Sequence, residues 1–290
     1  MKPAQGLPLG VMQGRLLPKH LGRYQAHPVG RWREEFPLAA SLGLCCIEFI
    51  LDFEGARDNP LLSAEGARDI ARTAHESGVA VRTVCADYFM AAPLHDPSPR
   101  TAARSAQVLR ELLRLAPAVG VACVVVPCVD QSSLSGDPAA ADRLVEALSP
   151  YAREAGEAGV TLALETDLSP PEFAALLSRL PTTIGVNYDT GNSAALGFDP
   201  AEEMAAYGDR VASVHIKDRT LGGGSVELGQ GAADFDRFFE ALARTGFSGP
   251  FIMQAYRDDE GTAVFARQLQ GIVPRIRKYT ETLAAGPRTS

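Results

Sequence analysis

The sequence is poor in the residues that mark several common protein classes. It has five histidines and one tryptophan in 290 residues, and its five cysteines are an odd number. No apolar run reaches about 18 residues, so we expect no segment to span a membrane. The first residues lack the apolar core of a secretory signal. The cysteines stand in or beside apolar runs, which favours buried free thiols in a reducing cytoplasm over a disulfide framework.

An excess of positive charge is also absent. The chain has 28 basic and 35 acidic residues, a formal charge of −7. A nucleic-acid partner is therefore not expected, because binding to phosphate backbones normally depends on clustered Lys and Arg. Hydrophobic residues make up 46% and charged residues 22% of the chain, which is typical of a soluble globular protein with a large core.

Apolar segments of strand length alternate with segments of helical spacing along the whole chain. The expected strands are 9–14, 44–51, 79–85, 123–129, 161–166, 183–189, 211–218 and 250–256. The expected helices that follow them are 31–41, 63–78, 98–119, 137–159, 169–180, 200–207, 233–245 and 261–283. Eight such units with no long linker predict an α/β fold, a (β/α)8 TIM barrel, as a single domain over residues 1–290. An open doubly wound sheet is the alternative, and the regular repeat favours closure.

Four of the expected strands end in a side chain that can bind a hard metal cation. These are Glu165, Asp189, His215 and Gln254, on the fifth to eighth strands. Each alone has an ordinary explanation; a carboxylate such as Asp189, for example, often caps the next helix. Because barrel active sites lie at the carboxyl ends of the strands, the four together predict one site of mixed oxygen and nitrogen ligands. Such a site suits Mn²⁺, Mg²⁺, Co²⁺ or Zn²⁺.

Other polar residues follow strands on the same side of the expected barrel. Gln13 and Arg15 follow the first strand, where Arg15 could clamp a carboxylate or phosphate or be a salt-bridged loop residue. Arg219 is a plausible substrate contact after the seventh strand. Glycines at 222–224 and 229–231 lack the Lys-Ser/Thr of a phosphate-binding loop, so a flexible lid is the better interpretation.

Five stretches of the sequence together resemble a known family. They are 10–15 (GVMQGR), 162–165 (LALE), 187–192 (NYDTGN), 214–219 (VHIKDR) and 228–235 (LGQGAADF). The chain resembles the xylose isomerase-like barrel superfamily (AP endonuclease family 2), and within it the sugar phosphate isomerase/epimerase group. The resemblance runs nearly end to end. Its DxGN and VHIKD motifs are fairly specific for the superfamily and not for one substrate.

The resemblance implies a role for each strand-end residue. Glu165, Asp189 and His215 would be metal ligands, and Glu165 would also move a proton next to a carbonyl. Members usually carry a second Glu on the eighth strand, where this chain has Gln254. Glutamine can offer its amide oxygen to a metal but cannot take a proton at neutral pH. Asn192 stands where ketose 3-epimerases tend to have a histidine, which also points away from that subgroup.

The loss of the second carboxylate leaves three mechanisms open. Glu165 could shuttle one proton between adjacent carbons through an enediolate. A second acid/base could come from Glu48, Asp87 or Lys217, and we take Glu165 and Lys217 as the candidate catalytic pair. The reaction could instead be a metal-assisted elimination. The residues expected to contact substrate are Gln13, Arg15, Glu48, Asp87, Asn192 and Arg219.

The expected function is that of a metal-dependent isomerase or epimerase acting on a small sugar, sugar phosphate or cyclitol. The first alternative is a dehydratase or lyase acting on a keto-sugar or keto-inositol. Two further alternatives are a sugar-binding barrel without catalysis and a DNA-repair enzyme of the endonuclease IV type, which needs more metal ligands than this chain offers. Exposed barrel helices commonly pair, so a homodimer is a further expectation.

Overall fold

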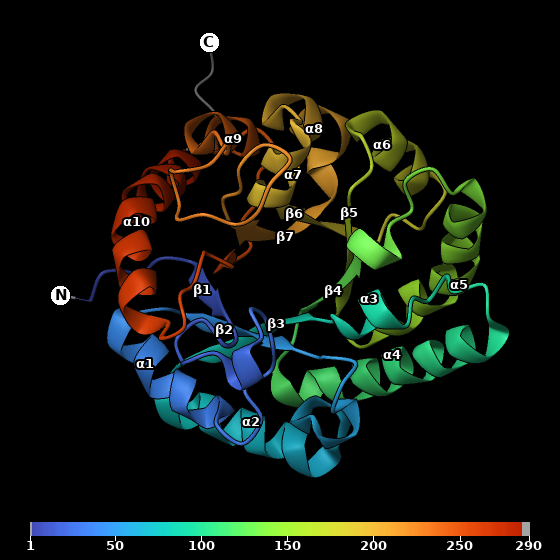
Figure 1. Cartoon of the computed structure of the whole chain (residues 1–290), viewed down its shortest axis with the longest axis horizontal. Coiled ribbons are helices and arrows are strands. Elements are labelled where there is room, and N and C mark those ends of the chain that lie inside the picture. The colour runs from blue at the N-terminus through green and yellow to red at the C-terminus, as the bar shows by residue number, and fades with distance from the viewer. Residues whose placement is uncertain (1, 286–290) are drawn as a thin grey trace.

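The structure, a computed structural model, describes residues 2–285 and contains the predicted barrel. Eight parallel strands follow one another in sequence order, and β1 pairs with β8 to close the ring. Figure 1 shows the strands at the centre with the helices around them. The strands are β1 (Leu9–Met12), β2 (Cys46–Ile50), β3 (Ala80–Cys85), β4 (Cys123–Cys128), β5 (Thr161–Thr166), β6 (Gly185–Asp189), β7 (Val211–Ile216) and β8 (Phe251–Met253). The chain is therefore a TIM barrel, as predicted.

A helix follows each strand, also as predicted. These helices are α1 (Glu35–Leu42), α2 (Ala64–Ser77), α4 (Pro99–Val119), α5 (Pro138–Glu157), α6 (Pro170–Ser178), α8 (Pro200–Tyr207), α9 (Phe235–Leu242) and α10 (Thr262–Ala284). Ser63 caps α2 by accepting a hydrogen bond from Gly66 N, and Asp137 caps α5 in the same way through Ala140 N. Within residues 2–285, no helix has the length and apolar character needed to cross a membrane.

The structure adds short helices that the sequence pattern did not reveal. The α-helical ones are α3 (Tyr88–Ala91) and α7 (Thr190–Leu196), at the carboxyl ends of β3 and β6. The 3-10 segments outside the predicted helices are η1 (His20–Gly22), η3 (Ala56–Asp58), η4 (Pro60–Leu62), η5 (Asp130–Ser132) and η6 (Gly208–Arg210), whereas η2 (Trp32–Glu34) begins the helix predicted over 31–41. One or two turns are too short to show a helical period. Both α3 and α7 border the candidate site.

The inside of the barrel is filled by a small apolar cluster separate from the main core. The main core lies between the strands and the helices, whereas the inner cluster comes from five different strands. Its members are Met12, Cys46, Ile50, Cys85, Val125 and Ile252. The interior is therefore packed rather than a pore. All five cysteines are free, but Cys45 is exposed, which corrects the prediction that all are buried.

A buried carboxylate orders the loop between β7 and α9. Asp218 is fully buried, and its Oδ2 accepts hydrogen bonds from Gly229 N at 2.8 Å and Gly231 N at 2.9 Å. Its Oδ1 accepts from Ala233 N at 3.1 Å. A Cβ at Gly231 would collide with the Asp218 carboxylate. The glycines at 229 and 231 are thus fixed to the end of β7 and are not part of a free lid.

Close packing between β1 and β2 requires a glycine at position 10. Gly10 pairs with Cys46, and a Cβ at Gly10 would collide with the Cys46 sulfur and lie 2.8 Å from its carbonyl oxygen. Neither the strand backbone nor the inner cluster offers space for an extra methyl group. By contrast, a Cβ at Gly156 in α5 would meet no atom within 4 Å.

We therefore expect Gly10→Ala to destabilise the protein and Gly156→Ala, the matched control, to stabilise it slightly. Overpacking should lower the free energy of unfolding by about 1–3 kcal/mol. The control should raise it by up to about 1 kcal/mol, because alanine favours the helix. Urea unfolding followed by circular dichroism measures both. Equal stability of the two variants would contradict the packing argument.

Candidate metal centre

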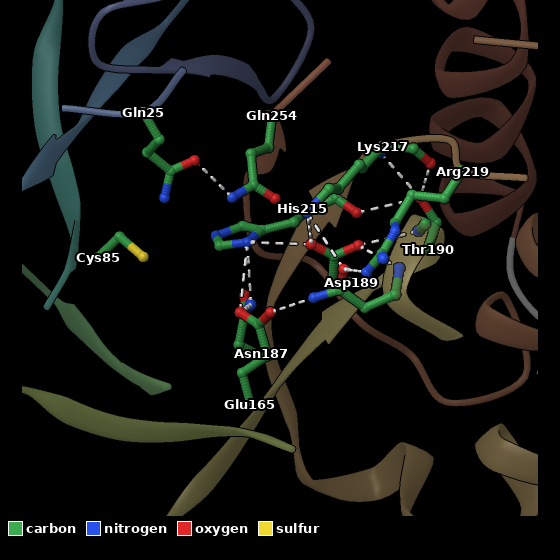
Figure 2. A network of polar contacts seen from close by, with 12 residues as sticks. Gln25, Cys85, Glu165, Asn187, Asp189, Thr190, His215, Lys217, Arg219 and Gln254 are labelled. Atoms are coloured by element: carbon green, nitrogen blue, oxygen red, sulfur yellow. Dashed lines mark hydrogen bonds and ion pairs between the residues drawn. The ribbon is translucent and has the colours of Figure 1, made fainter. Parts of the chain in front are cut away.

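Three predicted ligands converge at the carboxyl ends of β5, β6 and β7. Glu165, Asp189 and His215 each place one ligand atom within 4.8 Å of the other two, and all three are buried. His215 Nδ1 lies 3.6 Å from Glu165 Oε2 and 3.8 Å from Asp189 Oδ2. Figure 2 shows the ring pointing into the space between these groups. Barrel closure and the pairing of Asp189 with His215 bring them together.

Asp189 has two roles, one for each oxygen. Its Oδ1 caps α7 by accepting hydrogen bonds from Gly191 N at 2.9 Å and Asn192 N at 2.8 Å. Its Oδ2 is buried and accepts no hydrogen bond within the described residues. Capping and metal binding, the two interpretations of this residue from sequence, are therefore compatible. The cap fixes the direction in which Oδ2 points.

A chain of side-chain hydrogen bonds fixes the orientation of the Gln254 amide. Gln254 follows β8 and donates from Nε2 to Gln25 Oε1 at 2.9 Å. Gln25 Oε1 also accepts from Arg15 Nη2 at 3.0 Å, and Gln25 Nε2 donates to Asp87 Oδ2 at 2.7 Å. Because Arg can only donate, this pattern permits one orientation of each amide. It leaves Gln254 Oε1 buried, without a hydrogen bond, on a side chain directed toward His215 (Figure 2).

The buried charges shift one another's pKa values. Burial, followed by the nearby Asp189 carboxylate, raises the pKa of Glu165 to about 7. For Asp189 burial acts in the same direction, but Lys217 and His215 outweigh it and lower its pKa to about 2. Burial opposes the charged form of His215, yet Glu48, Asp189 and Glu165 raise its pKa well above the usual value. The site therefore strongly favours a positive charge at its centre.

Glu48 lies behind His215 rather than in the substrate space. It is fully buried, and its Oε1 is 2.8 Å from His215 Nε2. Neither of its oxygens accepts a hydrogen bond from another group in residues 2–285. This corrects the prediction of Glu48 as a substrate contact or second base, because Glu48 is fully buried and does not line the pocket. A carboxylate on the far nitrogen of a histidine fixes the ring and its tautomer.

Arg15 and Gln13 are also placed outside the substrate space, contrary to prediction. Arg15 is 1% exposed, and besides Gln25 its guanidinium donates to Ala255 O at 3.0 Å and Tyr24 O at 3.1 Å. The guanidinium therefore donates to groups inside the protein, and it forms no salt bridge with any residue of 2–285. Gln13 is fully buried, and its Oε1 accepts from Ile50 N at 3.1 Å. Both residues fold the first loop onto the barrel.

The other predicted residues line one pocket of about 430 Å³ above the three ligands. Asn192 connects them: its Nδ2 donates to Glu165 Oε1 at 2.7 Å, and its Oδ1 accepts from Lys217 Nζ at 3.1 Å and Arg219 Nη1 at 3.0 Å. Asp87 lies in the same wall, and its pKa is raised by burial. Glu165 and Gln254 also reach this pocket.

Two residues of the site received no role from the sequence. Asn187 donates to Glu165 Oε2 at 2.8 Å and lies 3.1 Å from His215 Nδ1. Its place two residues before Asp189 puts it on the same face of β6, so strand alternation could have found it. Gln25 lies in the irregular loop after β1, where no periodic signal exists.

A divalent cation fits this donor set. Gln254 Oε1 is buried with no hydrogen-bond partner within the described residues, which is costly unless another group binds it. Asp189 Oδ2 likewise accepts no hydrogen bond there, and its nearest cation is Lys217 Nζ at 3.6 Å. The Asp189 and Glu165 carboxylates lie beside the His215 ring, and Figure 2 shows the Gln254 side chain directed toward the same ring. Three oxygen ligands and one imidazole nitrogen suit Mn²⁺, Mg²⁺, Co²⁺ or Zn²⁺.

Comparison with known proteins identifies relatives that share this fold. The family model for the xylose isomerase-like TIM barrel matches residues 36–278. L-ribulose-5-phosphate 3-epimerase UlaE of Escherichia coli (strain K12) is 26% identical over 275 residues, which covers 89% of this chain and 95% of UlaE.

Two solved structures share the fold. The structure of an L-ribulose 3-epimerase has a TM-score of 0.71 at 18% identity and covers 97% of this chain and 99% of its own. A xylose isomerase-like TIM barrel protein from Mycobacterium smegmatis, in complex with magnesium, has a TM-score of 0.71 at 19% identity, covering 96% and 99%. The chain therefore belongs to the xylose isomerase-like TIM barrel family.

Proposed function

We propose that this protein is a divalent-metal-dependent sugar isomerase or epimerase that removes a proton from a carbon next to a carbonyl group. One observation carries the proposal: Glu165, Asp189 and His215 bring ligand atoms within 4.8 Å of one another, and Glu165 lines the same polar pocket as Gln254, whose Oε1 has no hydrogen-bond partner within the described residues. The sugar epimerases among its relatives support the same reaction class. The M. smegmatis protein of the same fold was solved in complex with magnesium, which is consistent with a divalent metal in this proposal.

The four residues would hold the cation through Glu165, Asp189 Oδ2, His215 Nδ1 and Gln254 Oε1. When bound, it would act as a Lewis acid that stabilises negative charge developing on a carbonyl oxygen. The protein supplies the geometry. Glu48 holds the His215 ring from behind, and the α7 cap holds Asp189.

Glu165 is the proposed base. It reaches the pocket, where its carboxylate can meet a proton of a bound substrate, and in the metal-free protein burial raises its pKa to about 7. Two amides, from Asn187 and Asn192, donate to its two oxygens and hold the carboxylate in place.

The second acid/base of the proposed reaction cannot be the eighth-strand glutamate that family members usually carry. Gln254 cannot accept a proton, and Glu48 does not reach the pocket. Lys217 and Asp87 both line it, from the carboxyl ends of β7 and β3. We propose Lys217, held by Asn192 beside the ligands, as the partner of Glu165.

A metal-assisted dehydratase or lyase acting on a keto-sugar or keto-inositol is the second candidate. The neutral Gln254 favours it, because elimination needs one base and a Lewis acid rather than two opposed carboxylates. An endonuclease IV type of site is opposed by the single cluster of three metal-binding residues found in the described part of the chain. A barrel that binds sugar without catalysis would leave its ligand unlabelled in deuterated water.

The decisive test is deuterium uptake from D₂O by ketoses, keto-inositols and 3-keto sugars in the presence of Mn²⁺, followed by NMR. We expect exchange at the carbon next to the carbonyl, and its loss with EDTA. Glu165→Gln should slow exchange by about 10²–10⁴-fold, the usual contribution of a general base. Exchange at the normal rate in Glu165→Gln, or without metal, would refute the proposal.

Glu48→Gln should weaken Mn²⁺ binding about tenfold or more, although Glu48 is not a ligand. The variant keeps the shape of the side chain but removes the charge that fixes the His215 ring, an effect of about 10–100-fold in other metal sites. Calorimetric titration measures the affinity, and thermal unfolding checks the fold. Glu146→Gln is the control, because it removes the same negative charge from an exposed residue on α5. Unchanged affinity in Glu48→Gln would rule out its supporting role.

Gln25→Ala should weaken Mn²⁺ binding about tenfold by freeing the Gln254 amide. Gln254→Leu should weaken it at least as much. If Gln25 acts through Gln254, the double variant should bind no worse than Gln254→Leu alone. Gln131→Ala, in the same pocket wall but without a contact to Gln254, is the control. Additive losses in the double variant would contradict the hydrogen-bond chain.

A further inference from the structure

The pocket has two ends with different charge. Near the ligands, Lys217 and Arg219 face Glu165 across Asn192. The end formed by the loops after β2, β3 and β4 contains more acids than bases. Its carboxylates are Asp52, Glu54, Asp87 and Asp130, and Arg23 is the one cation among the described residues that line this end.

Arg23 is already neutralised. Its Nη2 lies 2.8 Å from Asp52 Oδ1, and Asp52 Oδ2 accepts a hydrogen bond from His27 N at 2.8 Å. Glu54, Asp87 and Asp130 form no salt bridge within residues 2–285. Three carboxylates without a cationic partner therefore remain at this end.

The neighbouring cations do not reverse this balance. Arg15 is buried and used by internal acceptors, and Arg257 donates to the carbonyl oxygens of Gly14 and Leu17. Arg104 lies on α4 with its guanidinium carbon 5.9 Å from the Phe53 ring centre, and it does not line the pocket. A phosphate dianion at this end would meet like charge in a partly desolvated space, which is unfavourable.

The same end suits a chain or ring of hydroxyl groups. Glu54 and Asp130 offer carboxylate oxygens that accept from no side chain in the described part of the protein, and Asp87 has lone pairs beyond those used by Gln25 and Cys85. Phe53, which is 40% exposed, adds an apolar face beside these acceptors. Acceptors beside an apolar face can bind the O–H and C–H groups of a sugar together.

We infer that the substrate of the proposed site is an unphosphorylated polyhydroxylated ketone whose hydroxyl groups donate to Glu54, Asp87 and Asp130. This inference rests on the proposed function, because the carbonyl must lie at the ligand end for its hydroxyl tail to reach the acidic end. It separates this chain from its relative UlaE, whose name specifies a phosphorylated substrate.

The test compares matched pairs in the Mn²⁺-loaded full chain: L-ribulose, D-fructose and D-tagatose, each with its terminal phosphate ester. Deuterium uptake from D₂O gives kcat/KM for every compound. We expect the unphosphorylated member of at least one pair to exceed its phosphate ester by tenfold or more. A phosphate ester that exchanges as well or better overturns the inference and leaves the proposed function standing. Exchange with no compound, in protein shown to bind Mn²⁺, overturns the proposed function and this inference with it.

A charge-neutralising variant tests the cause. Glu54→Gln with Asp130→Asn removes two exposed acids, and asparagine tolerates the positive φ of 51° at position 130. We expect kcat/KM to rise about tenfold for the phosphate ester and to fall a few-fold for the free sugar, which loses two strong acceptors. The gain should shrink at high salt.

Glu76→Gln with Glu146→Gln makes the same change of charge on α2 and α5, away from the pocket, and is the control. An equal gain for the phosphate ester in this control would show a general effect of net charge and overturn the proposed role of the acidic end. A gain confined to the pocket variant supports it.

Discussion

The imidazole of His215 stands between carboxylates on both of its edges, and the site depends on this arrangement. Glu48 meets Nε2 from inside the barrel, while Glu165 and Asp189 face Nδ1 from the pocket side. Three buried carboxylates are costly unless positive charge balances them. His215, Lys217 and a cation would share that task. Folding energy and metal affinity are therefore linked in this protein, since a cation removes a repulsion that the fold itself creates.

The residue at position 254 determines the net charge of the proposed ligand set. In the proposed site, a neutral Gln254 would leave a cation with two carboxylates and one imidazole instead of a third negative ligand. A cation there would keep more of its charge to polarise a bound carbonyl. The same neutrality leaves no proton acceptor at this position after β8, so in the proposed reaction proton transfer would rely on β5 and on the loops beyond the ligands. Charge at the centre and the choice of acid/base are thus consequences of one residue.

Much of this architecture was predictable because it follows periodic rules. Apolar runs and helical spacing gave all eight strands and the helices after them, and barrel closure then required Glu165, Asp189 and His215 to meet. The wrong predictions concern side chains whose positions do not follow from strand or helix periodicity. Arg15 was expected in the substrate space, but the loop after β1 folds inward and carbonyl groups use its donors. Glu48 belongs to a strand, yet the sequence could not show that its side chain would be buried against His215.

The hydrogen-bond chain from Arg15 through Gln25 to Gln254 also constrains how this site can evolve. A glutamate at 254 would bring its carboxylate against Gln25 Oε1, acceptor against acceptor. Turning the Gln25 amide over would relieve that contact, but it would then point an NH₂ group at Arg15 and a carbonyl at Asp87. A two-carboxylate centre would thus require changes at several positions together. Glutamate at 254 is compatible with this loop only if the partners of Gln25 change with it.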